Sequence, residues 1–246
     1  MSKIFVIGDI HQKHQIAERY LQSWDGPVIF MGDYFDDFND TPNDAIATAE
    51  WLKDSLLKTN RIHLMGNHDV HYMLPAESNM YCSGYTPEKH KAIKQILTNE
   101  DWNKIKFFHS ENNCWFSHGG ITHRWFSHPI HGTTKDTIES IVAQGILDIK
   151  NRIYNGSGIK ALCAADHYRG GFFDKGGLLW NDWRNSEFFP GITQVVGHTP
   201  RERVMCAKRK TKREFGININ VDTHLQQAII LNTEDSSYDV LELKNL

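Results

Sequence analysis

The chain has 246 residues, a formal net charge of -3 and a hydrophobic fraction of 40%. This length can bury a sizeable core, and the near-neutral charge gives no indication of nucleic acid or an anionic membrane as a partner. No signal-peptide pattern opens the chain, and no apolar run approaches the roughly 18 residues of a membrane span. The cysteines Cys82, Cys114, Cys163 and Cys206 form no CxxC pair. We therefore expect a cytoplasmic protein with free thiols, although spacing alone leaves a disulfide open.

The first third of the chain alternates short apolar runs, typical of buried strands, with segments of helical spacing. The predicted strands are residues 4–7, 28–31 and 61–65, and the predicted helices are residues 14–24 and 43–57. Each strand ends in glycine or just before it, and a polar residue of metal-ligand type follows. This order predicts a parallel sheet with crossover helices. Because no GxGxxG follows the first strand, a dinucleotide-binding domain is disfavoured.

The rest of the chain is predicted to add a helical excursion and a second group of strands. Predicted helices are residues 87–97, a short one near Trp102 and residues 133–153, and predicted strands are 107–108, 114–117, 193–196, 217–221, 227–231 and 240–243. The first two of these strands form a hairpin that turns at residues 111–113. Residues 155–177 are rich in glycine and are predicted to be irregular. Since no repeat or linker interrupts the sequence, we expect a single domain over residues 1–246.

Six polar side chains stand just after predicted strands. They are Asp9, His11, Asp33, Asn67, His118 and His198. Taken singly, each could be a surface-turn residue or a hydrogen-bonded core histidine. Together, carboxylates, imidazoles and an amide without a thiolate suit divalent ions, and we expect Mn²⁺, with Fe, Zn, Ni or Mg as alternatives. Six ligands are too many for one catalytic ion but fit two that share a carboxylate. Two ions roughly 3.5–4 Å apart polarise a phosphoryl oxygen and generate hydroxide, which predicts hydrolysis of phosphate esters by attack of a metal-bound hydroxide.

Five motifs in order strengthen this prediction. They are residues 8–11 (Gly-Asp-Ile-His), 32–36 (Gly-Asp-Tyr-Phe-Asp), 66–69 (Gly-Asn-His-Asp), 117–120 (Ser-His-Gly-Gly) and 197–199 (Gly-His-Thr). Together they resemble the calcineurin-like metallophosphoesterase superfamily, in particular its phosphoprotein phosphatase branch with the bacterial and phage serine/threonine phosphatases. The resemblance implies an α/β fold, a β-sandwich flanked by helices, with a di-metal site at the strand ends.

The resemblance also implies a role for each motif residue. Asp9 and His11 would hold one ion, Asp33 would bridge, and the other ion would be held by Asn67, His118 and His198.

A catalytic pair is implied by the same motifs. His68 would be the general acid, oriented by Asp36, because a histidine beside a carboxylate has a raised pKa and can donate a proton near neutral pH. His68 could instead be a metal ligand or a solvated loop residue. Asp182 is expected to stand behind the ligands, and Asp222 is expected to be structural.

The sequence departs from the phosphatase pattern where the substrate would bind. Asp37 and Met65 occupy positions where the protein phosphatases carry phosphate-binding arginines. Because a bidentate arginine is the natural partner of a phosphate dianion, we expect a different phosphate grip or a less charged substrate. Arg124 and Arg169 are the candidate substrate-binding residues, and Arg184 is a further one. Residues 64–71 and 117–122 also resemble the symmetrical diadenosine tetraphosphatases.

Three functions therefore remain open. The first is a phosphatase acting on phosphomonoesters, with phosphoserine or phosphothreonine included. The second is the same chemistry on a diadenosine polyphosphate or another nucleotide or nucleic-acid phosphate. The third is a scaffold that keeps the fold without catalysis, which is disfavoured because every expected ligand position is filled. The expected partner is a phosphorylated small molecule, protein or nucleotide, with no membrane involved.

Overall fold

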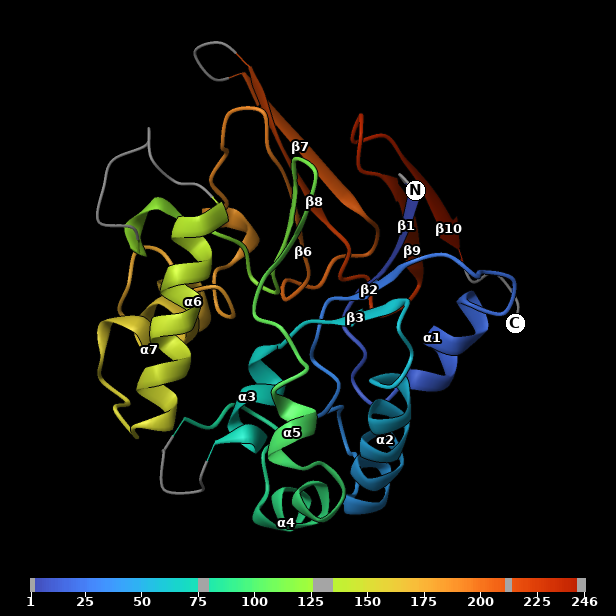
Figure 1. Ribbon diagram of the computed structural model, residues 1–246, viewed down its shortest axis with the longest axis vertical. Helices are drawn as coiled ribbons and strands as arrows, with labels where there is room; N and C mark the ends of the chain where they lie inside the picture. Colours follow the sequence, from blue (N-terminus) through green and yellow to red (C-terminus); the bar gives the residue numbers. More distant parts are fainter. Residues whose placement is uncertain (1–2, 75–79, 126–134, 211–213, 243–246) are drawn as a thin grey trace.

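Two five-stranded sheets form the centre of the computed structural model, which describes residues 3–74, 80–125, 135–210 and 214–242 (Figure 1). The first sheet has the order β10-β9-β1-β2-β3, and the second has the order β4-β5-β6-β8-β7. The strands are β1 (Lys3–Ile7), β2 (Val28–Phe30), β3 (Arg61–His63), β4 (His109–Glu111), β5 (Cys114–Phe116), β6 (Thr193–Val196), β7 (Met205–Lys210), β8 (Phe215–Asn220), β9 (Gln227–Asn232) and β10 (Tyr238–Glu242).

Parallel pairing in both sheets sets the position of the site. In the first sheet β1 pairs with β2 and β2 with β3, all parallel, as the sequence predicted. In the second sheet β5, β6 and β8 are parallel neighbours. Because loops that leave parallel strands at their carboxyl ends emerge at one edge, each sheet presents its post-strand residues together.

Alternation along the strands divides the core into two layers. Ile4 and Val6 point into the space between the sheets, where they pack with Phe116, Val195 and other residues of the second sheet. Phe5 and its neighbours of the same parity point the other way, into a layer shared with helices. This period-two burial on both faces is what produces the continuous apolar runs in the sequence.

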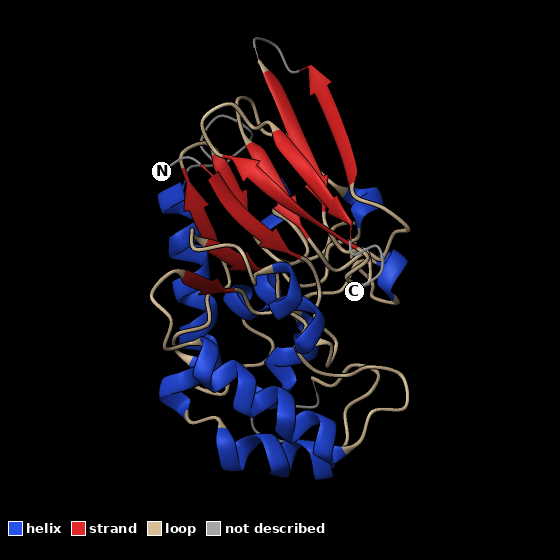
Figure 2. Cartoon of the chain, turned by 90° about the vertical axis from the view of Figure 1, so that its right-hand side faces the viewer, coloured by secondary structure: helices blue, strands red, loops and turns tan. Residues whose placement is uncertain are grey.

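Helices cover the outer faces and one end of the sandwich (Figure 2). They are α1 (His14–Tyr20), α2 (Pro42–Ser55), α3 (Asn67–Met73), α4 (Pro87–Ile96), α5 (Asn99–Trp102), α6 (Lys135–Lys150) and α7 (Ser157–Cys163). The described part of the chain contains no helix that is both long and apolar enough to cross a membrane. Residues 133–134, at the start of one predicted helix, lie outside the described residues.

The structure corrects three details of the predicted elements. The hairpin begins at His109, so residues 107–108 lie before it rather than in it. Helix α7 forms inside residues 155–177, where irregular structure was predicted, because its apolar residues pack against α6. Helix α3 and strand β7 were not predicted at all: α3 is short and polar, and β7 is an exposed edge strand without an apolar run.

Candidate metal centre

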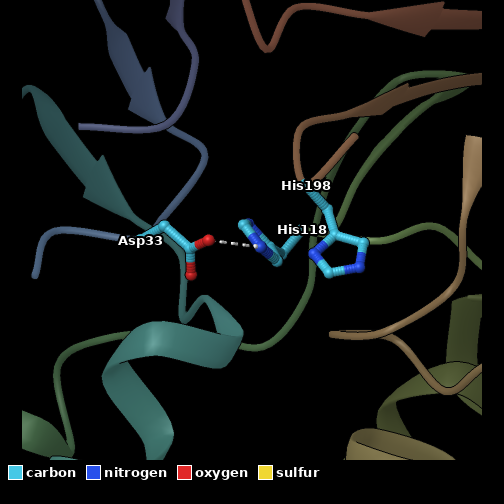
Figure 3. A group of neighbouring side chains, drawn as sticks. All are labelled: Asp33, His118 and His198. Carbon is cyan, nitrogen blue, oxygen red and sulfur yellow. Dashed lines mark ion pairs between the residues drawn. The ribbon is translucent and has the colours of Figure 1, made fainter. Parts of the chain in front are cut away.

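The six strand-end side chains converge from both sheets. Asp9 and Asp33 follow β1 and β2, Asn67 opens α3 just after β3, and the two histidines His118 and His198 follow β5 and β6. Ligand atoms of Asp9, His11 and Asp33 lie within 4.8 Å of one another, and those of Asp33, His118 and His198 do the same. Asp33 therefore belongs to both groups, and Figure 3 shows its carboxylate directed at His118 with His198 alongside.

Asn67 completes the second group. Its Oδ1 lies 2.9 Å from Nε2 of His118 and 2.8 Å from Nδ1 of His198. Nε2 of His118 is also 3.2 Å from Oδ2 of Asp33. On the other side, Asp9 accepts the backbone N–H of His198 at 3.0 Å, which joins the first sheet to the second.

The histidine tautomers direct lone pairs into this space. Nδ1 of His118 donates to the carbonyl of Met31 at 2.8 Å, and Nδ1 of His11 donates to the carbonyl of Asp36 at 2.8 Å. In a neutral ring each Nε2 is then an acceptor, and both face carboxylate oxygens. Nε2 of His198 is buried without a hydrogen-bond partner among the described residues. Two hydrogen-bond acceptors that face each other in a buried site repel each other, and a cation bound between them would remove this repulsion. The set of ligand atoms therefore fits divalent metal ions.

The charges of the cluster are strongly coupled. Burial raises the pKa of Asp9 well above its usual value, and the nearby Asp222 raises it further. Burial also opposes ionisation of Asp33, but positive charge on His118 and His68 holds its pKa well below the usual value. For His118, burial is outweighed by Asp33 and Asp9, which raise its pKa to about 10. The pocket thus favours cationic charge next to Asp33.

Four residues in or beside this cluster have a strained backbone conformation. His11, Asp33, Asp36 and His198 have φ angles of 40°, 49°, 64° and 64°, in the left-handed region that side-chain-bearing residues rarely adopt. Such conformations persist where the surrounding structure imposes them and are typical of functional sites. Gly66 is required for a different reason, since a Cβ there would overlap the Asp33 carboxylate.

Asp69 holds the turn after β2 against the start of α3. Its carboxylate accepts backbone N–H groups of Asp33, Tyr34 and Gly66 at 2.8, 2.7 and 2.8 Å. Sequence reasoning placed Asp69 in a motif but gave it no role. The available signal was its position three residues after Gly66, which is the capping position of a helix first turn.

Asp36 is the acceptor of a second buried cluster. Its Oδ2 lies 3.2 Å from Nδ1 of His68 and 3.0 Å from Nε2 of His71. Its Oδ1 accepts Tyr72 Oη and Lys89 Nζ, each at 2.6 Å. Burial works against protonation of His68, yet the charge of Asp33 and the hydrogen bond that His68 donates to Asp36 outweigh it and raise its pKa to about 12. This environment favours the protonated imidazole of His68.

Lys89 and Cys82 are two neighbours of this cluster that sequence reasoning missed. The Lys89 side chain is only 2% exposed and also binds Asp40, at 2.9 Å. Cys82 Sγ donates to the carbonyl of Asn67 at 3.1 Å. Cys82 and the other three cysteines are free thiols, as predicted.

A cavity of about 620 Å³ opens over the metal centre. Arg169 lines it, and its Nη2 donates to the carbonyl of His198 at 3.1 Å and to Thr199 Oγ1 at 2.9 Å. Asp182 lies behind Arg169, 2.9 Å from its Nε, and also pairs with Arg184. Among the described residues that line the cavity, Arg169 is the sole arginine.

Arg124 and Arg184 lie elsewhere. Arg124 pairs with Asp174 and packs over the Trp125 and Phe173 rings, and it is not among the described residues that line the cavity. The guanidinium of Arg184 lies 3.9 Å above the Tyr168 ring, at the side of the cavity.

The sandwich and the ligands gathered at its edge define the class of protein, a metal-dependent hydrolase of phosphoesters. The sequence profile of the calcineurin-like phosphoesterases matches residues 2–223, and the chain belongs to this family. The enzyme class and the fold predicted from the motifs are thereby confirmed, and the family is a two-metal one.

Solved structures agree on the fold. A "putative diadenosine tetraphosphatase" is 14% identical, with a TM-score of 0.51 over 100% of this chain and 95% of that one. A protein serine/threonine phosphatase from Saccharomyces cerevisiae, with similarity to human phosphatase PP5, is also 14% identical, with a TM-score of 0.53 over 99% of this chain and 80% of that one. A comparison with curated protein sequences gives no significant match.

Proposed function

We propose that this chain hydrolyses phosphomonoesters with two Mn²⁺ ions. The observation that supports this most is the carboxylate of Asp33, which belongs to two ligand groups at once. When bound, two divalent ions polarise a phosphoryl oxygen and lower the pKa of water. Asp9 and His11 would hold one ion, Asp33 both, and Asn67 with the histidines 118 and 198 the other. Lone pairs of His118 and His11 already point toward Asp33.

His68 is the proposed proton donor to the leaving-group oxygen. Its backbone N–H donates to Asp33 Oδ1 at 2.8 Å, which places the ring beside the proposed bridging carboxylate. Asp36 orients the ring through Nδ1, so Nε2 is the atom that carries the transferable proton. A protonated imidazole held in this way is suited to act as a general acid.

Arg169 is the proposed phosphate-binding residue. Asp182 pairs with its guanidinium, whose Nη2 donates to the carbonyl of His198 at the edge of the cavity. Asp37 and Met65 stand where the protein phosphatases carry phosphate-binding arginines, and Arg169 would supply the missing positive charge from another loop. Arg124 is a weaker proposal, because its guanidinium is already paired with Asp174.

A nucleotide phosphoester is the second candidate substrate, and one specific observation favours it. Phe38 lines the cavity although its side chain is 94% exposed, and Tyr168 lines it as well. Exposed aromatic rings at the edge of a phosphoester-binding cavity can stack on a nucleobase. A phosphopeptide would have less use for them.

Turnover of three substrates tests these assignments. We expect Mn²⁺-dependent hydrolysis of an aryl phosphate monoester, compared with an aryl phosphodiester and with diadenosine tetraphosphate; preference for the last would favour the nucleotide function. The purified protein should carry two ions per chain. No turnover with Mn²⁺, Ni²⁺ or Mg²⁺, together with much less than two ions, would instead support the scaffold.

Four free cysteines support a reducing, cytoplasmic location.

A further inference from the structure

A second cavity adjoins the one over the metal centre. Its volume is about 580 Å³, and the two cavities share Pro200 and His224 in their linings. Arg201 and Arg203 line the second cavity, with Glu202 as its one acidic residue among the described ones. A ligand that leaves the metal centre on this side therefore meets guanidinium groups first.

Strand β7 continues this path. It begins at Met205, which lines the second cavity, and its next residues lead to Lys208, Arg209 and Lys210, all exposed. Met205 pairs with Asn220 of β8, just before Asp222 in the lining of the first cavity. The near end of β7 is thus fixed beside the metal centre, while the hairpin extends away from the body (Figure 1). At about 3.3 Å per residue the strand spans about 20 Å.

The five basic side chains on this path have no acidic partner among the residues that the structure describes. Arg201, Arg203, Lys208, Arg209 and Lys210 form no ion pair with any residue of the described ranges. Nε of Arg201 is buried without a hydrogen-bond partner there. We call these five residues the basic track. The chain as a whole has a net charge of -3, whereas the basic track is locally positive, so the net charge of the chain gives no indication of it.

Protection of a sheet edge explains only part of the track. Lysines on an edge strand prevent pairing with other chains, and β7 is an edge strand. Arg201 and Arg203, however, precede the strand and line a cavity that adjoins the proposed catalytic one. Edge protection needs no such cavity residues.

We propose that the substrate is the phosphorylated end of a single-stranded nucleic acid, whose chain runs from the metal centre past Arg201 and Arg203 and along β7. A basic groove for the backbone and exposed aromatic rings for the bases are the two features that such binding combines; Phe38 and Tyr168 supply the second. The inference rests on the proposed phosphomonoesterase activity. The terminal P–O bond to the nucleoside oxygen breaks, a P–O bond to water forms, and His68 gives the nucleoside oxygen its proton.

Binding of a fluorescent oligonucleotide with a terminal phosphate tests the track without turnover. We would measure anisotropy with full-length Asp33→Asn protein, with and without the triple change Lys208→Gln, Arg209→Gln and Lys210→Gln. The triple variant should bind at least tenfold more weakly at low salt. Its slope of log affinity against log salt should also be smaller by about two, since about 0.7 counterions are released per phosphate contact on single strands.

A matched control removes three exposed lysines elsewhere. The control carries the changes Lys58→Gln, Lys91→Gln and Lys94→Gln. These changes alter the net charge by the same amount at exposed positions far from β7 in the sequence, and we expect unchanged affinity. Equal loss in both triple variants, or no loss in either, would overturn the proposal. So would tighter binding of the wild-type chain to phosphatidylserine vesicles or to an acidic phosphopeptide than to the oligonucleotide.

Kinetics separate this inference from the proposed function. The kinetic test uses the enzyme that retains Asp33. There the β7 triple change should lower kcat/KM for the phosphorylated oligonucleotide at least tenfold relative to kcat/KM for an aryl phosphate. If the wild type hydrolyses neither, the phosphomonoesterase proposal fails while the anisotropy result still decides on the track. If it hydrolyses both and the ratio is unchanged in the variant, the track is wrong and the phosphomonoesterase proposal stands.

Discussion

Asp33 is the residue on which the two ligand groups depend. Its side chain lies within ligand distance of histidines from both sheets, and its backbone is held in the left-handed region. We expect Asp33→Asn to lower kcat for an aryl phosphate at least about a hundredfold, because an amide cannot bridge two cations as a carboxylate does. Activity and metal content of the purified variant measure this. A variant that kept two ions and near-normal kcat would show that Asp33 is not the bridge.

His68 should affect chemistry without affecting metal content. Its ring faces Asp36, and it belongs to neither of the two ligand groups that share Asp33. We expect His68→Asn to reduce kcat about a hundredfold or more, the usual contribution of a general acid, while two ions per chain remain bound. Wild-type turnover in this variant would refute the acid role, and loss of metal would indicate a ligand role instead.

Sequence reasoning located these residues because each has a local signature. A strand, then glycine, then a ligand-type side chain is visible without knowledge of tertiary contacts. Lys89 carries no such signature: it lies in an ordinary helical pattern, 53 positions from Asp36. Only the packing of α4 against the loop after β2 reveals that its ammonium is buried, so it could not have been predicted from spacing.

At the scale of elements, Lys89 attaches α4 to the catalytic edge. Its Nζ is buried between Asp36 and Asp40. We expect Lys89→Met to lower the free energy of unfolding by about 3–5 kcal/mol, because two carboxylates lose their buried counter-charge. Urea denaturation measures this loss. Lys89→Arg should recover part of the stability, and a methionine variant as stable as the wild type would contradict the argument.

Strand β3 carries a histidine that the fold keeps neutral. His63 is buried, stacks on Phe30 at 4.6 Å, and has Tyr34 Oη and Ser55 Oγ each 3.0 Å from a ring nitrogen. Burial, followed by the charge of Arg61, lowers its pKa to about 3. The folded pKa is below the unfolded one, so this contribution to stability is complete above about pH 6.5 and is lost as the pH falls toward 3.

The resulting pH dependence can be measured. Between pH 7 and pH 5 the wild type should lose about 2 kcal/mol of unfolding free energy through His63. His63→Gln, which does not titrate, should be less stable at pH 7 but should lose about 2 kcal/mol less over the same interval. Denaturant melts at the two pH values give both numbers. Parallel losses in the two proteins would mean that His63 is not responsible.

Elements with weak sequence patterns were the ones that sequence reasoning missed. Strand β7 has exposed charges on both faces, so neither an apolar run nor a clean alternation marks it. Its register is set by β8, to which it pairs from Met205 to Lys210. The central strands were predictable because they are buried on both sides, whereas β7 was not, because its position comes from its pairing with β8.

At the scale of the whole molecule, the site joins the two sheets into one unit. Asp9 after β1 accepts the backbone N–H of His198 after β6, and the layer between the sheets draws on both. We propose a single domain and expect one cooperative unfolding transition. Tryptophan fluorescence and far-ultraviolet circular dichroism should give coincident urea curves. Two separated transitions would instead divide the chain into two independently folding parts.

The pairing of β1 with β9 has a consequence for synthesis on the ribosome. β1 lies between β2 and β9, and its antiparallel partner residues, from Ile229 to Asn232, are made more than 220 residues after it. At roughly 5–20 residues per second, the nascent first strand waits on the order of 10–45 seconds with one side unpaired. During that interval an apolar strand with open backbone groups is exposed to other chains, so translation speed and chaperone supply should govern how much protein reaches the native state.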